Sequence, residues 1–287
     1  MPLIQRGFMK NSRTVSVAAL LLLVWGSPVF CADAQRQISA ITVHPEGVMK
    51  FQLRSTDRLP DAAGEVRVER RGGMTEIEVH LDSLKPASLF GGDYNTYVLW
   101  IVPPRGPAEN AGEFPLDGNR TSLRTSTEAR TFALLVTAEP HYLVSTPSPF
   151  VVLENPSEAG AQLVTYQPIE GVYNFVRSSL ADVKKARGEV HTEVRQAFTA
   201  VRLAQRAEAV RFAPEALQEA QHALDQTLDL WRRRVDRSEI AAQARATVRL
   251  ALTAQHLAEN RAFQARLELE GLGGGSAEPG RHVPREQ

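Results

Sequence analysis

Hydrophobic and polar residues alternate along the first half of the chain, from Ile38 to Asn155. Val66 and Val68 stand between charged neighbours, and Ile77 and Val79 do the same further on. A period of two places every second side chain on the same face of a β-strand, so these segments are predicted to be strands with one buried face. Alternation of this kind, more or less regular, occurs at 38–42, 48–53, 65–69 and 76–81.

Three later segments are apolar throughout and are predicted to be strands buried on both faces. They lie at 97–102, 132–137 and 150–153. Turn-forming sequences separate the strands, among them Gly72-Gly73 between two alternating runs, which predicts a hairpin. Seven or more short strands without a helical period between them favour an antiparallel, immunoglobulin-like β-sandwich over residues 35–156.

Near Pro168 and Gly171, the spacing of the apolar residues changes from a period of two to the period of a helix. Apolar residues then recur at alternating steps of three and four, which is the pattern of a heptad seam, interrupted at Arg187. Gly188 within this seam predicts a local irregularity. The seam consists of Val176, Leu180, Val183, Val190, Val194, Ala197, Val201 and Ala204.

Two further helices are predicted after this seam. Pro214 suits the first turn of the second helix, and Asp236 and Glu239 fit a capping box that begins the third. Small residues on the third helix allow close approach of the helix axes. Its seam contains Ala244, Ala251, Ala258 and Ala265, one heptad apart. We therefore predict a linker at 157–170, a three-helix antiparallel, coiled-coil-like domain at 171–270, and a disordered tail at 271–287.

The N-terminus has the order of regions expected of a secretory signal peptide. Basic residues precede an apolar run at 15–24, Pro28 ends this run, and small residues follow at Ala32 and Ala34. We predict a signal peptide at 1–34, cleavage after Ala34 and a periplasmic location. An uncleaved membrane anchor and a lipoprotein modified at Cys31 remain alternatives, although Phe30 fits a lipidation motif poorly. Cleavage after Ala34 would leave no cysteine and therefore no disulfide.

The charge balance argues against nucleic acid as a partner. The chain has 33 Lys and Arg residues and 33 Asp and Glu residues, with a formal net charge of +0. A nucleic-acid-binding protein normally needs a basic surplus to neutralise phosphates.

No arrangement of residues in the sequence indicates catalysis, a cofactor or a metal site. None of the seven histidines has the His-Glu-x-x-His spacing of a zinc hydrolase, and neither a Gly-x-Ser-x-Gly elbow nor a phosphate-binding loop is present. His222 and His256 would come near one another if the second and third helices pair, but two ligands are too few for a metal site. We therefore predict a protein that is not an enzyme.

Two sets of residues are candidates for binding. The first is a partner-binding helix face, through which the chain would bind another protein or itself. It comprises Leu217, Leu224, Leu228, Trp231, Ala244, Ala251 and Ala258. The second is the basic run Arg232, Arg233 and Arg234, which either complements the dipole at the end of the second helix or contacts anionic lipid headgroups or an envelope polymer.

Part of the β region resembles the extracytoplasmic β-sandwich of anti-sigma factors of the sigma-K-regulator type. The resemblance lies in Tyr-Val-Leu-Trp at 97–100, Gly-Glu-Phe-Pro-Leu at 112–116 and the strand sequence at 131–140. It implies a β-sandwich outside the cytoplasm. Sigma binding is not implied, because such factors carry a sigma-binding helical domain before their membrane span, and only about 14 residues precede the apolar run here.

The helical region is similar to an uncharacterised Ala-rich helical domain of bacterial envelope lipoproteins and OmpA-linked proteins. The resemblance covers about residues 201–263, beginning with Phe-Ala-Pro-Glu-Ala-Leu at 212–217. Together these features favour a non-enzymatic envelope protein that acts through binding. An envelope-stress or anti-sigma-like signalling accessory and an enzyme with an unrecognised site remain alternatives.

Overall fold

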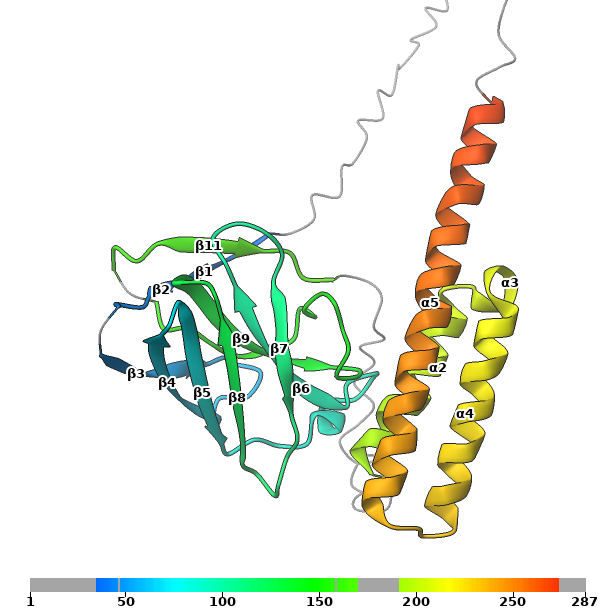
Figure 1. Ribbon diagram of the computed structural model, residues 1–287, viewed down its shortest axis with the longest axis horizontal. Helices are drawn as coiled ribbons and strands as arrows, with labels where there is room; N and C mark the ends of the chain where they lie inside the picture. Colours follow the sequence, from blue (N-terminus) through cyan, green and yellow to red (C-terminus); the bar gives the residue numbers. More distant parts are fainter. Residues whose placement is uncertain (1–34, 46, 158, 170–190, 274–287) are drawn as a thin grey trace, which may run out of the picture. The chain divides into compact units, whose positions relative to one another are not determined.

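The computed structural model describes residues 35–45, 47–157, 159–169 and 191–273, with side chains up to Glu270. An antiparallel β domain is followed by a helical region (Figure 1). This confirms the coarse prediction from the change of period. The predicted signal peptide, Cys31, and the first part of the predicted heptad seam, including Val176 and Leu180, lie outside the described residues.

The β domain is built on one antiparallel sheet that curls nearly into a barrel. Its strands follow the order β7-β6-β9-β10-β3-β4-β5-β8, and β2 pairs with β9. The strands are β2 (Ile41–Thr42), β3 (Val48–Ser55), β4 (Ala63–Arg71), β5 (Met74–Asp82), β6 (Thr96–Val102), β7 (Glu109–Phe114), β8 (Thr121–Thr127), β9 (Thr131–Glu139) and β10 (Val151–Glu154), with a short 3-10 helix, η1 (Ala87–Phe90), before β6.

Two glycine positions shape this sheet. Gly72 and Gly73 both have positive φ, as a two-residue turn requires, and they join β4 to β5 in the predicted hairpin. At the opposite ends of the strand order, β7 and β8 come into contact. Gly112 of β7 has φ 133°, and a Cβ atom there would lie 3.2 Å from the Leu123 side chain of β8. Glycine therefore allows the close approach that nearly closes the sheet.

Strands β6 and β9 are buried on both faces, as predicted from their apolar sequences. Their inner faces carry Leu99 and Leu134, which pack against Val68 and Val79 of the facing strands. On their outer faces lie Val98, Trp100 and Leu135, together with Ile38 and Tyr166 from two further strands. A polar residue on either face of β6 or β9 would therefore enter a core.

The two strands that cover this outer face correct the predicted linker. Strand β1 (Arg36–Ser39) pairs antiparallel with β11 (Leu163–Tyr166) in a separate two-stranded sheet. Residues 163–166 fall within 157–170, which the sequence analysis assigned to a linker. Val164 and Tyr166 are buried, so this segment belongs to the β domain.

The helical region contains α2 (Thr192–Arg206), the short α3 (Ala209–Phe212), α4 (Pro214–Arg232) and α5 (Arg237–Gly273). Pro214 opens α4 as predicted. Asp236 directly precedes α5, and its carboxylate accepts a hydrogen bond of 2.9 Å from the backbone N–H of Ser238 in the first turn. This is the capping half of the predicted box. Helix α5 continues to Gly273, so residues 271–273 of the predicted disordered tail are helical.

Alanine dominates the core of the helical region. The cluster contains Ala197, Ala200, Ala204, Ala209, Ala213, Ala220, Ala244, Ala251, Ala254 and Ala258, with Val201, Leu217, Leu224 and Val248. Side chains this small let α2, α4 and α5 approach closely. Among the described residues, no helix combines the length and the apolar composition needed to cross a membrane.

Candidate functional site

Five of the seven residues assigned to a partner-binding helix face lie inside the helical core. Leu217, Leu224, Ala244, Ala251 and Ala258 are buried against one another and their neighbours. Helices of the same chain cover them, so they are not on the surface in this structure. A heptad seam in a sequence shows that a face is covered without showing what covers it.

Leu228 and Trp231, the other two residues of that face, line an open pocket of about 310 Å³. Both come from the last turns of α4, and the opposite wall is α2. Gly92 and Asn95, from the loop before β6, complete the lining. The α2 residues in the wall are Val194, Arg195, Phe198, Thr199 and Arg202. We take this α2–α4 pocket as the candidate binding site.

Phe198 is the most accessible apolar group of the α2–α4 pocket, with 47% of its surface exposed. The Arg202 guanidinium lies 5.5 Å from the centre of the Phe198 ring, within the range of a cation–π contact. Arg195 also lines the pocket, whereas no acidic residue does. The site therefore offers an aromatic ring and Leu228 for apolar contact, with arginine side chains beside them.

Asn95 fixes the loop wall of the pocket to α2. Its Nδ2 group lies 3.0 Å from Thr199 Oγ1 and 3.0 Å from the Pro140 carbonyl oxygen. A third contact, of 3.1 Å, reaches the Asp93 carbonyl oxygen. Contacts to α2, to Pro140 and within its own loop hold this amide in place, so the wall does not depend on a ligand for its shape.

Asp93 lies beneath the pocket and pairs with two arginines of α2. Its side chain is fully buried, and its carboxylate forms ion pairs with Arg202 and Arg206, one helical turn apart. The carboxylate draws both guanidinium groups to the sheet side of α2. Without Asp93, two arginines one turn apart would lack their shared counter-charge.

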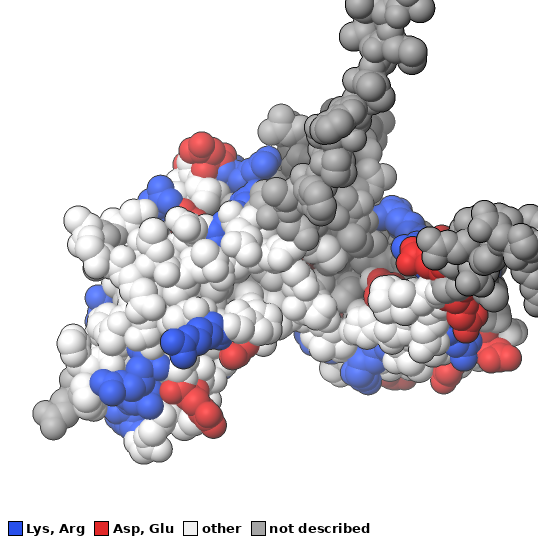
Figure 2. All heavy atoms as spheres, turned by 90° about the horizontal axis from the view of Figure 1, so that it is seen from above, with Lys and Arg blue, Asp and Glu red and all other residues white. Residues whose placement is uncertain are grey.

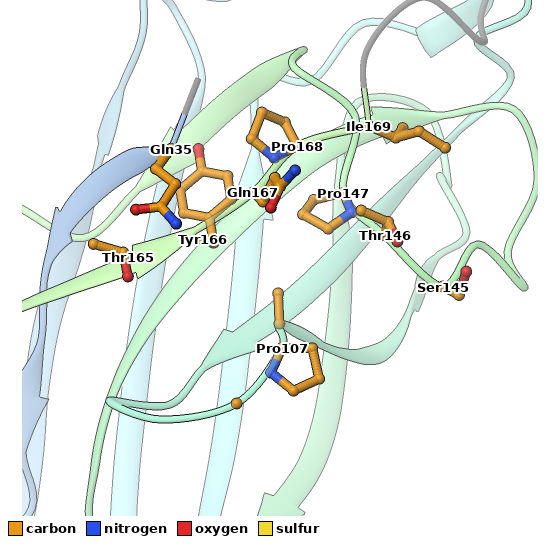
Figure 3. Close-up of a pocket in the computed structure, with 12 residues that line it drawn as sticks. Gln35, Pro107, Ser145, Thr146, Pro147, Thr165, Tyr166, Gln167, Pro168 and Ile169 are labelled. Carbon is orange, nitrogen blue, oxygen red and sulfur yellow. The ribbon is translucent and has the colours of Figure 1, made fainter. Parts of the chain in front are cut away.

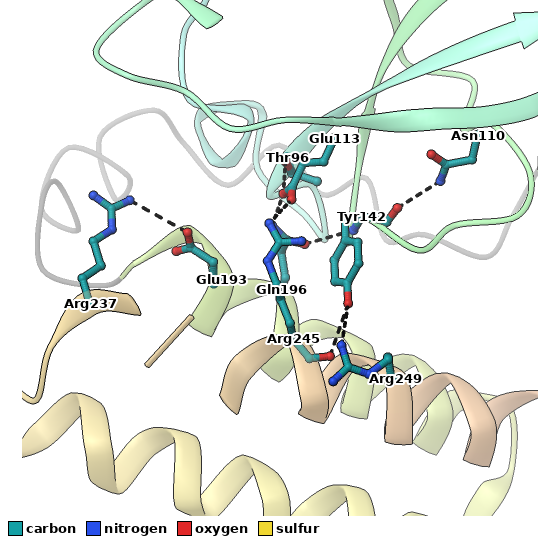
Figure 4. A network of polar contacts seen from close by, with 9 residues as sticks. All are labelled: Thr96, Asn110, Glu113, Tyr142, Glu193, Gln196, Arg237, Arg245 and Arg249. Carbon is teal, nitrogen blue, oxygen red and sulfur yellow. Dashed lines mark hydrogen bonds and ion pairs between the residues drawn. The ribbon is translucent and has the colours of Figure 1, made fainter. Parts of the chain in front are cut away.

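A second group of polar contacts joins β7 to α2 and α5 (Figure 4). The Glu113 carboxylate, almost fully buried, accepts hydrogen bonds of 2.7 Å from Thr96 Oγ1 and 2.6 Å from Gln196 Nε2. Arg245 of α5 pairs with its other oxygen at 2.6 Å. One carboxylate of the sheet thus binds two helices at once.

Tyr142, in the loop after β9, adds to this network (Figure 4). Its backbone N–H donates to Gln196 Oε1 at 3.0 Å. The Arg245 guanidinium lies 4.5 Å from the centre of its ring, and Arg249 Nη1 lies 3.4 Å from its hydroxyl. With Glu113, these contacts position α2 and therefore one wall of the α2–α4 pocket.

The basic run follows Trp231 directly at the end of α4. Arg232, Arg233 and Arg234 are all exposed. Arg233 lies 3.3 Å from Asp229, one turn earlier in the helix. Figure 2 shows one face of the molecule, on which acidic and basic side chains are interspersed. The predicted contact with an anionic partner stays a prediction.

A larger pocket of about 600 Å³ lies beside β11 (Figure 3). Pro107, Pro147, Pro168 and Tyr166 contribute to its lining, together with short polar side chains. Its lining contains no charged residue. The α2–α4 pocket is the better candidate because it combines apolar and charged groups.

The most strongly perturbed carboxyl group lies in the β domain. Glu139 Oε1 accepts hydrogen bonds from Thr137 and from the Ser148 backbone N–H, the latter at 2.7 Å, and Thr137 in turn accepts one from Trp100. Burial raises the pKa of Glu139 to about 8, although these hydrogen bonds act in the opposite direction. The raised pKa of Glu139 favours the neutral carboxyl group at pH 7.

The histidines are distributed over both regions. Burial, followed by the influence of His256, lowers the pKa of His141 to about 4. His222 lies 3.1 Å from Gln226 on α4. Within the described segments, no group of three or more His, Cys, Asp or Glu side chains could hold a metal ion.

Phe198, Asn95 and Asp93 were not among the residues singled out from the sequence. Asp93 and Asn95 lie in the loop sequence Gly-Gly-Asp-Tyr-Asn-Thr, which has no periodic pattern. The spacing of Arg202 and Arg206 was an available signal. Two like charges at i and i+4 destabilise an isolated helix, so such a pair calls for a carboxylate from elsewhere in the chain.

No protein-family model, no curated protein and no solved structure matches this chain.

Proposed function

We propose that this chain is a non-enzymatic, exported envelope protein that binds a partner in the α2–α4 pocket. The proposal rests on one observation above all: Phe198 exposes nearly half of its surface in a pocket whose walls are already held by the contacts of Asp93 and Asn95. A pre-formed pocket with apolar walls and a few polar groups is the usual form of a binding site.

The lining favours a partner that presents an apolar group next to a negative charge. Phe198 and Leu228 offer apolar contact. Arg202 and Arg206 share the single Asp93 carboxylate, which leaves one positive charge in excess beside the pocket. Arginine stacks on rings and binds carboxylates and phosphates with the same planar group. A volume of about 310 Å³ lies at the small end of the range of ligand pockets, so a small group fits it.

Site-specific photo-crosslinking in the cell envelope tests this function. A photoreactive phenylalanine analogue is placed at Phe198 and, as a matched control, at Val48 of β3, which is exposed to the same extent (47% against 46%). We expect discrete crosslinked products from position 198 alone, and their loss when Trp231→Ala is added. The same products from both positions, or none from position 198, would overturn the proposal.

The chemistry of the partner is tested with purified protein and two small probes. Phenylacetate carries a ring and a carboxylate, whereas phenethylamine carries the same ring and a positive charge. We expect saturable binding of phenylacetate, weakened at least several-fold in Phe198→Ala, and much weaker binding of phenethylamine. Equal binding of the two probes would contradict the role of the arginines.

A further inference from the structure

Strand β11 has a β-strand partner on one edge only. On that edge it pairs antiparallel with β1. In continuation of the same register, the Ala40 backbone N–H donates a hydrogen bond of 2.8 Å to the Gln162 carbonyl oxygen. Residues of an antiparallel pair alternate between those that exchange backbone hydrogen bonds and those that do not. The backbone groups of Val164 and Tyr166 therefore point toward β1, and those of the residues between them point away.

Three residues turn their backbone N–H and C=O groups away from β1. They are Leu163, Thr165 and Gln167, of which Gln167 comes directly after β11. Among the described residues, none forms a hydrogen bond with these backbone groups. All three side chains are exposed, that of Leu163 to 56%. We name these three residues the free edge.

The next residue in this series already has a backbone partner. The Ile169 N–H, two residues beyond Gln167, donates a hydrogen bond of 2.9 Å to the Pro147 carbonyl oxygen. Proline has no backbone N–H, so Pro147 cannot return a hydrogen bond. The side of the chain opposite β1 is therefore able to pair with a backbone, and the ladder that begins at Ile169 is not continued along the free edge.

The free edge borders the pocket of about 600 Å³ beside β11 (Figure 3). Thr165 and Gln167 belong to its lining, and the loops at 106–108 and 145–147 form further walls. Prolines and Tyr166 supply apolar surface, and no charged residue contributes to the lining. The pocket thus combines a row of backbone hydrogen-bonding groups with uncharged walls.

We propose that the free edge binds an extended segment of another polypeptide, which adds to the β1–β11 sheet as a third strand. The backbone groups on one side of an extended chain recur every second residue, or about 6.8 Å at roughly 3.4 Å per residue. This is also the spacing of the groups on the free edge. The backbone ladder supplies the affinity, and the pocket beside it selects the side chains. Because its walls are uncharged, the side chains that enter the pocket are uncharged as well.

The free edge lacks the usual protection of an edge strand. Charged side chains, especially lysine, and proline commonly block such edges, whereas Leu163, Thr165 and Gln167 are neither charged nor proline. In the main sheet, by contrast, the outermost strands β7 and β8 contact each other. The loops beside the free edge confine it to a groove, which admits one extended chain more readily than the sheet edge of a second folded copy.

This site is separate from the α2–α4 pocket, because the two have no lining residue in common. Its partner also differs in chemistry: an uncharged extended chain is recognised here through its backbone, whereas the α2–α4 pocket favours an apolar group next to a negative charge. A failed test of one site therefore leaves the other unaffected.

Amide hydrogen exchange of the full chain, followed by NMR, tests the geometry. The probe is an acetylated and amidated heptapeptide in which threonine and valine alternate. We expect saturable binding and at least tenfold slower exchange at Thr165 and Gln167. The Val164 and Tyr166 amides, bonded to β1, should exchange slowly with and without the peptide. No binding, binding that leaves Thr165 and Gln167 unchanged, or slow exchange at both before the peptide is added would overturn the proposal.

A proline on the free edge tests the contact from the side of the protein. Thr165→Pro removes an N–H that points away from β1, a position at which a strand tolerates proline. We expect the peptide to bind at least tenfold more weakly. Thr165→Val keeps the N–H and is the matched control, with the urea midpoint of both variants as a check on folding. A folded Thr165→Pro variant that binds the peptide like the wild type would contradict strand addition.

A change in the peptide tests the same contact without altering the protein. Methylation of every second backbone nitrogen removes the N–H groups along one edge of the peptide only. Of the two peptides methylated in alternate registers, we expect one to bind like the parent and the other at least tenfold more weakly, because only one edge of an added strand faces β11. Binding of both as tightly as the parent would show that no backbone ladder forms.

Discussion

The two regions of the molecule have cores of opposite composition. The β domain is filled by large side chains, among them Trp100, Tyr97, Phe114 and Phe132, which lie between sheet faces held apart by their bulk. In the helical region alanine fills most core positions, and the helices approach until little space is left. Each large side chain of the β domain therefore contributes to stability by burying apolar area. The helical region depends instead on the close packing of its helices.

Opposite changes of side-chain size should therefore destabilise the two cores. A core of large residues is damaged when a side chain is made smaller, because a cavity is left behind. Alanine side chains can hardly be made smaller, so a core of alanines is destabilised when a side chain is made larger. The following changes test this difference, beginning with the largest expected effect.

Truncation of the β-domain core should have the largest effect. Phe132→Ala removes a fully buried ring of β9 from the space between the sheet faces. We expect a loss of about 3–5 kcal/mol in the free energy of unfolding, measured by urea denaturation. A loss below about 1 kcal/mol would show that the inner face can collapse and that its packing is looser than the structure indicates.

Enlargement should damage the helical core. Ala251 is fully buried at the contact of α5 with its neighbours, so Ala251→Leu forces the helices apart. We expect a loss of about 1–3 kcal/mol in the same measurement. Ala242→Leu, on the exposed side of the same helix, is the matched control and should change stability little. Similar values for the two variants would contradict close packing of the helices.

The pH dependence of stability tests two buried titratable groups of the β domain, Glu139 and His141. The pKa of Glu139 is raised to about 8 in the folded state from an ordinary value of 4.5, so its contribution is fully present below pH 4.5 and is lost as the pH rises to about 8. The pKa of His141 is lowered from 6.5 to about 4, so its contribution is present above pH 6.5 and is lost as the pH falls to about 4.

Only Glu139 of these two groups therefore acts between pH 6.5 and pH 8. We expect the urea midpoint of the wild type to fall across this interval, and Glu139→Gln, which stays neutral, to flatten the change. His141→Gln serves as the control and should retain the slope above pH 6.5. An unchanged slope in Glu139→Gln would mean that the carboxyl group is not buried as a neutral acid.

The smallest expected effect concerns a hydroxyl pair in the alanine core. Thr227 of α4 and Thr247 of α5 are buried, and their Oγ1 atoms lie 2.9 Å apart. Thr227→Val removes one hydroxyl, and we expect a loss of about 0.5–1.5 kcal/mol. The double change Thr227→Val with Thr247→Val should not add a second full loss, because both polar groups are then gone. Fully additive losses would show that the two hydroxyls do not interact.

The sequence predicted those parts of the fold that depend on local periodicity. The strand around Ile77 and Val79 was recognisable because one face of it is buried and the other is solvated. Strand β11 was missed because it is four residues long and pairs with β1, more than 120 residues earlier in the chain. No local pattern records a pairing between such distant segments, and prolines around β11 favoured a linker instead.

Prediction of the candidate site was less complete for a related reason. The apolar stripe on α4 was recognised, and Leu228 and Trp231 on it do line the α2–α4 pocket. Phe198 and Asn95 come from a different helix and from a loop, and only the fold brings them together. The sequence could not separate pocket residues from core residues such as Leu224, because both follow the same heptad spacing.

A single uninterrupted helix, α5, links two contacts and an exposed end. Arg245 meets the sheet carboxylate Glu113, Ala251 lies in the bundle, and Leu269 stands free, about 36 Å from Arg245 at roughly 1.5 Å per residue. A helix is stiff along its axis, so it acts as a strut. Its direction is fixed at one end by the Arg245–Glu113 contact and in the middle by the bundle, so these two contacts together set where the free end points.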